Sequence, residues 1–150
     1  MRIGIDPGLN GAIAFVYDDR IEVEDMPTMI QPWSVSDVRM VDGVALYQML
    51  DAKKEEMESI TIEIVHTMPK QGVVSSGRFM GAFYTAVSIS RLFLEPKMVL
   101  PSQWKKHFGL INMPKDASRL AVLKMYPNLI PLLKRKKDVD RAEAIMIAVS

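Results

Sequence analysis

The sequence predicts an α/β fold in which a mixed five-stranded sheet has helices on both faces. Within the first 24 residues, three short strand-like runs are separated by turn residues, which is typical of antiparallel hairpins. Further along, strand and helix patterns alternate, which indicates parallel strands joined by crossover helices. The five expected strands are residues 1–6, 12–17, 21–24, 60–65 and 96–100.

The composition indicates one folded domain spanning residues 1–150. Of its 150 residues, 49% are hydrophobic and 25% are charged, which suits a sizeable core rather than disorder. There is no cysteine, which excludes disulfides and thiolate metal sites. We find no secretory leader and no run long enough to cross a bilayer. We therefore expect a cytoplasmic protein of a bacterium or a phage-infected host, in preference to a eukaryotic organelle.

The remaining elements are predicted from apolar spacing and from Gly and Pro positions. The expected helices are residues 41–57, 78–94, 102–109, 115–125 and 141–149. The expected loops are residues 29–38 and 66–77. Ser102 is interpreted as a helix cap and Gly109 as a helix stop, and either Asp138 or Asp140 begins the last helix.

Asp6 is the unusual residue of the first hairpin. Ile3 and Ile5 precede it on a strand that looks buried, and Pro7 and Gly8 follow it. One interpretation is ordinary turn chemistry, because Asp-Pro-Gly is a common turn sequence. The other is a buried carboxylate, which needs a partner or a metal ion.

Three further acids interrupt apolar patterns and favour the metal interpretation. Glu63 lies within an apolar strand, and Asp140 and Glu143 share one face of the last helix because they are three residues apart. The alternative for that pair is a capping box, with Asp140 as the N-cap. Four acids at one centre, without cysteine, favour Mg²⁺ or Mn²⁺, and two such ions can promote phosphodiester cleavage.

Basic residues cluster late in the chain, although its formal net charge is only +1. They either line a phosphate-binding face or form a solvated surface. In the loop after Glu63, Lys70 and Gln71 are further candidates for DNA contact. His66 and His107 are isolated histidines. Either one could act as a proton shuttle or stack on a base, but a structural role is commoner for such a residue. The late basic candidates are Lys105, Lys106, Lys115, Arg119 and the run of residues 134–137, which includes Lys136 and Lys137.

Several motifs together resemble the RuvC family of Holliday junction resolvases. These are I-G-I-D-P-G at residues 3–8, I-E-I-V at 62–65 and K-K-D-V-D-R-A-E-A at 136–144. The motifs D-M-P-T at 25–28, P-S-Q-W-K-K-H-F-G-L at 101–110, K-D-A-S-R at 115–119 and L-K-R-K-K-D at 133–138 are similar to phage and bacterial RuvC-like proteins and to the chloroplast resolvase of plants. The resemblance runs almost end to end.

This resemblance implies a ribonuclease H-like fold and a homodimeric, Mg²⁺-dependent endonuclease that nicks two opposed strands of a four-way DNA junction. It places Lys105 and Lys115 near the scissile phosphate, with Lys115 among the catalytic residues. It implies that the dimer forms through the helix that begins at Arg78 and ends at Leu94. His66 and Met68 are the candidates for a wedge at the junction centre. The implied metal ligands and catalytic acids are Asp6, Glu63, Asp140 and Glu143.

One departure from the family leaves the third acid open between Asp138 and Asp140. Close relatives have a His or a small residue between the K-K-D and R-A-E parts, where this chain has Val139 and Asp140. A spacing of three residues from Glu143 favours Asp140, because it keeps both acids on one helical face.

Other functions remain as alternatives. A sugar-kinase or actin-like ATPase shares G-I-D-x-G but needs two such domains, which 150 residues do not hold, so no nucleotide cofactor is expected. A junction-binding protein without cleavage would not require the four acids. Another ribonuclease H-like nuclease, acting on flaps, branched DNA or RNA–DNA hybrids, is compatible with the sequence.

Overall fold

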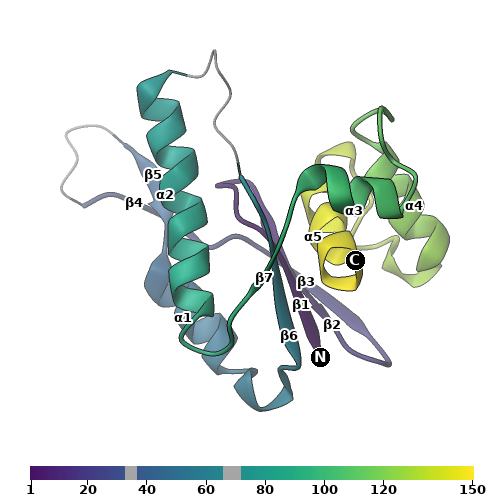
Figure 1. The fold of residues 1–150 in the computed structure, drawn as a ribbon, viewed down its shortest axis with the longest axis horizontal. Helices are drawn as coiled ribbons and strands as arrows, with labels where there is room; N and C mark the ends of the chain where they lie inside the picture. The colour runs from purple at the N-terminus through teal and green to yellow at the C-terminus, as the bar shows by residue number, and fades with distance from the viewer. Residues whose placement is uncertain (33–36, 66–71) are drawn as a thin grey trace.

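A five-stranded mixed sheet forms the centre of the computed structural model, which describes residues 1–32, 37–65 and 72–150 (Figure 1). The strand order is β3-β2-β1-β6-β7. β1 pairs antiparallel with β2 and parallel with β6, β2 pairs antiparallel with β3, and β6 pairs parallel with β7. The strands are β1 Arg2–Asp6, β2 Ala12–Val16, β3 Ile21–Asp25, β6 Ser59–Glu63 and β7 Lys97–Val99. The predicted α/β sheet is therefore confirmed.

Helices cover both faces of this sheet (Figure 1). On one face, α1 (Gly43–Asp51) and α2 (Val73–Ser90) pack on the isoleucines of β1 and β6, which point that way because side chains alternate along a strand. On the other face lie α3 (Pro101–His107), α4 (Ala117–Met125) and α5 (Val139–Val149). α5 lies between the sheet and α4, with seven of its eleven residues buried and none exposed.

Gly4 is the point at which α5 touches the sheet most closely. A Cβ atom built on Gly4 would lie 2.1 Å from the carbonyl oxygen of Ala144 and 2.4 Å from the backbone nitrogen of Ala148. These are backbone atoms, so no rotation of a side chain could relieve the overlap. A residue without a side chain is therefore needed at position 4 for α5 to lie at this depth.

The turn between β1 and β2 has a similar requirement at Gly11. Its backbone N–H donates to the carbonyl oxygen of Gly8 at 2.9 Å. A Cβ on Gly11 would lie 2.1 Å from the carbonyl oxygen of Asp6. The turn residues predicted from the sequence thus bring the chain back against the end of β1.

A small second sheet corrects the prediction of a loop over residues 29–38. Strand β4 (Thr28–Ile30) pairs antiparallel with β5 (Arg39–Val41). Each strand has three residues, which is too short for an alternating pattern to be recognised.

Two helices also differ from the prediction in their boundaries. α1 ends at Asp51 rather than at residue 57, because the charged residues that follow carry no apolar stripe, and they form only a short 3₁₀ turn at Lys54–Glu56. α2 begins at Val73 rather than at Arg78 and ends at Ser90 rather than at Leu94. Its first two turns bury no side chain fully, so they leave no core-facing period in the sequence.

The helices α3, α4 and α5 lie close to the predicted positions, but one predicted capping residue is wrong. α3 begins at Pro101, a favoured first helical residue, so Ser102 lies inside the helix and is not its cap. Gly109 follows α3 with φ +67°, which confirms the predicted stop. Among the described residues, no helix is long and apolar enough to cross a membrane.

We predict that Gly4→Ala destabilises the protein by about 3 kcal/mol or more, because the new methyl group overlaps backbone atoms of α5. Urea unfolding followed by circular dichroism would measure this change. The matched control is Gly77→Ala in α2, where nothing lies within 4 Å of the added Cβ. That change should stabilise the protein by about 0.5–1 kcal/mol. Equal effects at both positions would contradict the close contact.

Candidate metal centre

Two of the predicted acids lie at the ends of neighbouring parallel strands. Asp6 is the last residue of β1 and Glu63 is the last residue of β6. The last residues paired between β1 and β6 are Ile5 and Ile62, and each acid is the next residue on its strand. Because β1 and β6 run parallel, these acids emerge at the same edge of the sheet and on the face that α5 covers.

The other two acids come from the first turns of α5. Asp140 and Glu143 are three residues apart and lie on the face turned toward Asp6. One carboxylate oxygen each from Asp6, Asp140 and Glu143 lie within 4.8 Å of one another. This group of three acids could hold a metal ion. We call it the acid triad.

Asp138 has a different place and a different partner. It is buried and is the N-cap residue of α5, so the alternative of Asp140 as N-cap is wrong. Arg135 holds it with Nη2 at 2.7 Å from Oδ1 and with the backbone N–H at 2.7 Å from Oδ2. These hydrogen bonds lower the pKa of Asp138. The geometry therefore gives Asp140 to the acid triad and Asp138 to an internal ion pair.

Crowding and burial make the acid triad costly without a cation. Burial raises the pKa of Asp6 to about 8, with further increases from Glu63, Asp140 and Glu143, against a lowering by the Gly8 N–H. Burial also raises the pKa of Glu143, which Lys105 and Ser118 partly offset. Oxygen-only donors at this spacing suit a hard divalent cation.

Glu63 does not belong to the group of acids whose oxygens lie within 4.8 Å of one another, but it lines the same cavity. The indole Nε1–H of Trp104, a fully buried residue of α3, donates to Glu63 Oε1 at 2.7 Å. Burial raises the pKa of Glu63, and this hydrogen bond opposes the rise. Trp104 thus fixes the orientation of a carboxylate beside the acid triad.

Three residues of the site were not identified from the sequence. Trp104 is one, although a lone Trp in a charged segment was a signal. Ser118 is the second, and its hydroxyl donates to Glu143 Oε1 at 3.1 Å. Arg78 of α2 is the third, and it lines the cavity of about 490 Å³ into which the acids open. Only tertiary structure brings Ser118 and Arg78 to this place.

Two of the predicted lysines lie beside the acid triad. Lys115 Nζ is 3.3 Å from Asp140 Oδ1, and Lys105 Nζ is 4.0 Å from Glu143 Oε1. Lys115 is well exposed, so this pair contributes little to stability and leaves the ammonium group accessible.

The other predicted contact residues lie elsewhere or outside the described part of the chain. Arg119 donates to both carboxylate oxygens of Asp116, at 2.7 and 2.9 Å, and to the carbonyl oxygen of Leu133, so its guanidinium has partners within the protein. Lys106 and His107 are exposed at the end of α3, and Lys136 and Lys137 are exposed before α5. The residues His66, Met68, Lys70 and Gln71 lie outside the described residues.

We predict that Asp6→Asn stabilises the metal-free protein at pH 8. Because the folded-state pKa of Asp6 is about 8 and its ordinary value is 3.8, the folded protein binds the proton more tightly. The free energy of unfolding therefore falls as pH rises through this window, and Asn removes that loss. We expect a melting temperature several degrees above wild type at pH 8, at about 2–4 °C per kcal/mol, and little difference near pH 4.

The control for this prediction is Asp138→Asn. The pKa of Asp138 is lowered, so its contribution to stability is present above the ordinary pKa and is lost as pH falls. This variant should melt below wild type at neutral pH, with a smaller gap in acid. Shifts of the same sign in both variants would contradict the assignment of the two aspartates.

We also predict that Mg²⁺ or Mn²⁺ raises the melting temperature at pH 8. A ligand bound only to the folded state adds about 2.7 kcal/mol at one hundred times its dissociation constant. Asp6→Asn and Glu143→Gln should each lose most of this increase. Glu95→Gln should keep it, because Glu95 pairs with Arg91 on the surface away from the acids. Equal metal responses in all four proteins would remove the acid triad as the metal site.

Comparisons of the sequence with protein-family models and with curated proteins gave no match. The case for a functional site therefore rests on the motifs and on the geometry described above.

Proposed function

We propose that this protein has a ribonuclease H-like fold and is a divalent-metal-dependent endonuclease that resolves four-way DNA junctions. The observation that carries the proposal is the acid triad, at the end of the central strand, with two lysines beside it. The sheet supports it, since an antiparallel β3-β2-β1 half continues into a parallel β1-β6-β7 half. The sequence motifs of RuvC-like resolvases contain these same acids.

The residues of the site fit Mg²⁺ or Mn²⁺. All of the donors are carboxylate oxygens, and burial, with a smaller contribution from neighbouring acids, raises the pKa values of Asp6 and Glu143, so that the charged forms are costly without a cation. Asp6, Asp140 and Glu143 would hold the metal, with Glu63 positioned to share in a second site. When bound, such ions supply Lewis-acid stabilisation and an activated water for phosphodiester hydrolysis.

The chain's own cations would bind and orient the substrate. Lys115 and Lys105 each approach one acid of the triad, and Arg78 faces the same cavity from α2. A phosphodiester placed over the acids would meet positive charge on both sides. This arrangement favours an anionic backbone near a metal site and suits DNA better than a neutral substrate.

The homodimer belongs to the same proposal, because two opposed nicks require two active sites. Several apolar side chains of α2 are exposed to solvent in the described chain. Exposed apolar side chains that gather on one element often mark a surface that binds another protein. These side chains are Val73, Val74, Phe79 and Tyr84. A second copy packing on α2 would cover them and would place the two acid triads in one assembly.

We predict that the wild-type protein in Mg²⁺ makes paired, symmetric nicks in opposed strands of a synthetic four-way junction. A flap, an RNA–DNA hybrid and a linear duplex of the same sequences are the comparison substrates. Asp6→Asn should bind the junction but cut it at least about a thousandfold more slowly, because a metal ligand supports several kcal/mol of transition-state stabilisation. Denaturing gels would measure cutting, and gel shifts in Ca²⁺ would measure binding.

Glu95→Gln is the matched control and should cut like wild type, since its carboxylate is exposed and does not line the cavity of the acids. Equal cutting of all four substrates would contradict the resolvase assignment and favour a general ribonuclease H-like nuclease. Junction binding without cutting by wild type would favour a structural role. Cutting by Asp6→Asn at the wild-type rate would exclude the acid triad as the catalytic centre.

A further inference from the structure

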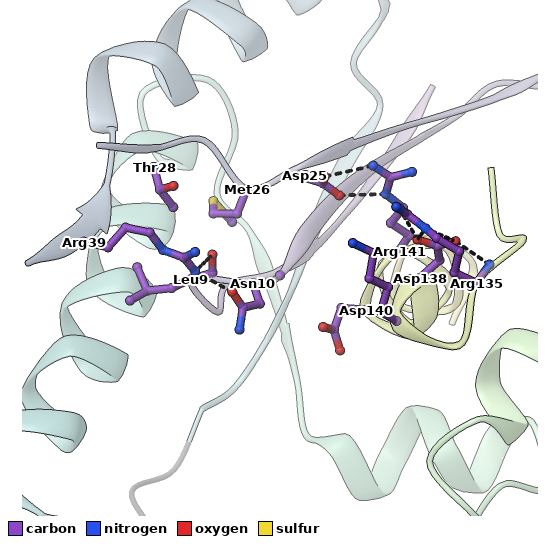
Figure 2. A pocket seen from close by; sticks show the side chains of 12 residues that line it. Leu9, Asn10, Asp25, Met26, Thr28, Arg39, Arg135, Asp138, Asp140 and Arg141 are labelled. Atoms are coloured by element: carbon purple, nitrogen blue, oxygen red, sulfur yellow. Dashed lines mark hydrogen bonds and ion pairs between the residues drawn. The ribbon is translucent and has the colours of Figure 1, made fainter. Parts of the chain in front are cut away.

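A second cavity borders the β1–β2 turn near Asp140 (Figure 2). Its volume is about 490 Å³, and it lies between the turn, strand β5 and the start of α5. It shares Leu9, Asn10, Gly11 and Asp140 with the cavity of the metal centre. The two cavities are therefore neighbours, and Asp140 borders both.

Arg39 of β5 provides one wall of this second cavity (Figure 2). Its Nη2 donates to the carbonyl oxygen of Leu9 at 2.6 Å and also to Asn10 Oδ1. Both acceptors are neutral, and within the described chain no carboxylate lies within ion-pair distance of this guanidinium. Arg39 is thus a positive charge held in place with its charge uncompensated.

The opposite wall contains ion pairs that are already complete. Arg141 binds both carboxylate oxygens of Asp25, at 2.7 and 2.8 Å, and Arg135 binds Asp138. Figure 2 shows the two pairs side by side at the start of α5. These pairs cancel in charge.

Apart from these ion pairs, the charged residues that line the cavity are the cations Arg39 and Lys137 and the anion Asp140. Lys137 is exposed, and the described part of the chain offers it no carboxylate at ion-pair distance. Asp140 belongs to the acid triad, where a metal ion would compensate its charge. The cavity is then positive, and Leu9 and Met26 add an apolar surface to its polar lining.

From these contacts we infer that the second cavity binds a backbone phosphate of the DNA strand being cut, next to the scissile phosphate. Arg39 and Lys137 would contact the phosphate, and Leu9 would contact the attached nucleotide. This inference rests on the proposed function. It identifies the direction in which the strand leaves the metal centre, across Asp140 and along the β1–β2 turn.

The test compares Arg39→Gln and Lys137→Gln with Lys124→Gln, which removes an exposed lysine of α4 that lines neither cavity. The probe is a synthetic four-way junction in Ca²⁺, titrated over a series of salt concentrations. Each test variant should bind severalfold more weakly, and the slope of log affinity against log salt should fall by about one. Lys124→Gln should match wild type.

A neutral methylphosphonate placed at single positions near the cleavage site locates the contact. Wild type should bind more weakly when the methylphosphonate stands at one position next to the scissile phosphate. Lys137→Gln should lose little further affinity from that methylphosphonate, because this variant already lacks the contact between the lysine and the phosphate. The side chain of Lys137 is exposed and makes no hydrogen bond within the described chain, so this arm does not depend on how Arg39→Gln folds. An equal methylphosphonate loss in both proteins, or an unchanged salt slope, would overturn the inference.

The outcomes also separate this inference from the proposed function. Wild type that cuts junctions while both test variants keep wild-type affinity and slope would overturn the phosphate site alone. Wild type that binds no DNA would overturn both. The Mg²⁺-induced rise in melting temperature should be unchanged in Lys137→Gln, because Lys137 lies outside the acid triad, and its loss would count against a separate phosphate site.

Discussion

The site depends on a backbone contact between α5 and the central strand at Gly4. Because position 4 has no side chain, the backbone at Ala144 and Ala148 lies almost directly on β1. Gly4 and Asp6 share one face of that strand, so the depth of α5 also determines how far Asp140 and Glu143 are from Asp6. A larger residue at position 4 would raise the helix and separate the acids. The same contact therefore sets the packing of the core and the geometry of the acid triad.

Once α5 is at that depth, the chain has to compensate a concentration of negative charge. Some compensation is internal: Trp104 donates to Glu63, Ser118 donates to Glu143, and two lysines approach, one from α3 and one from the segment just before α4. These contacts do not offset burial, which is the main reason that the pKa values of Asp6, Glu63 and Glu143 stay raised. A structural ion pair looks different. Asp138 and Arg135 satisfy each other, and the pKa of Asp138 falls. The contrast between Asp138 and the pair Asp6 and Glu143 argues that the acid triad can accept a cation from solution.

The sequence predicted the central sheet because its strands are bounded by turn residues and rich in β-branched side chains. It also predicted the acids, since a carboxylate within an apolar run is conspicuous. It missed β4 and β5 because three residues are too few for a period, and it missed the start of α2 because those turns bury no side chain fully. Arg78 and Ser118 were not identified as site residues for another reason. Nothing in their local pattern distinguishes them, and only the packing of α2 and α4 brings them to the acids.

The small sheet missed from the sequence also bears on how the site is held. Arg39 of β5 binds the carbonyl oxygen of Leu9, in the turn that directly follows Asp6 and Gly8. Gly11 closes the same turn against the carbonyl oxygen of Asp6. The turn is therefore fixed by its own backbone and by β5, and its residues line both the acid cavity and the cavity beside it. Under the proposed function, a turn held in place between these two cavities would keep the DNA backbone in one path. Arg39 would then serve two purposes, because the guanidinium that stabilises the turn also faces the cavity.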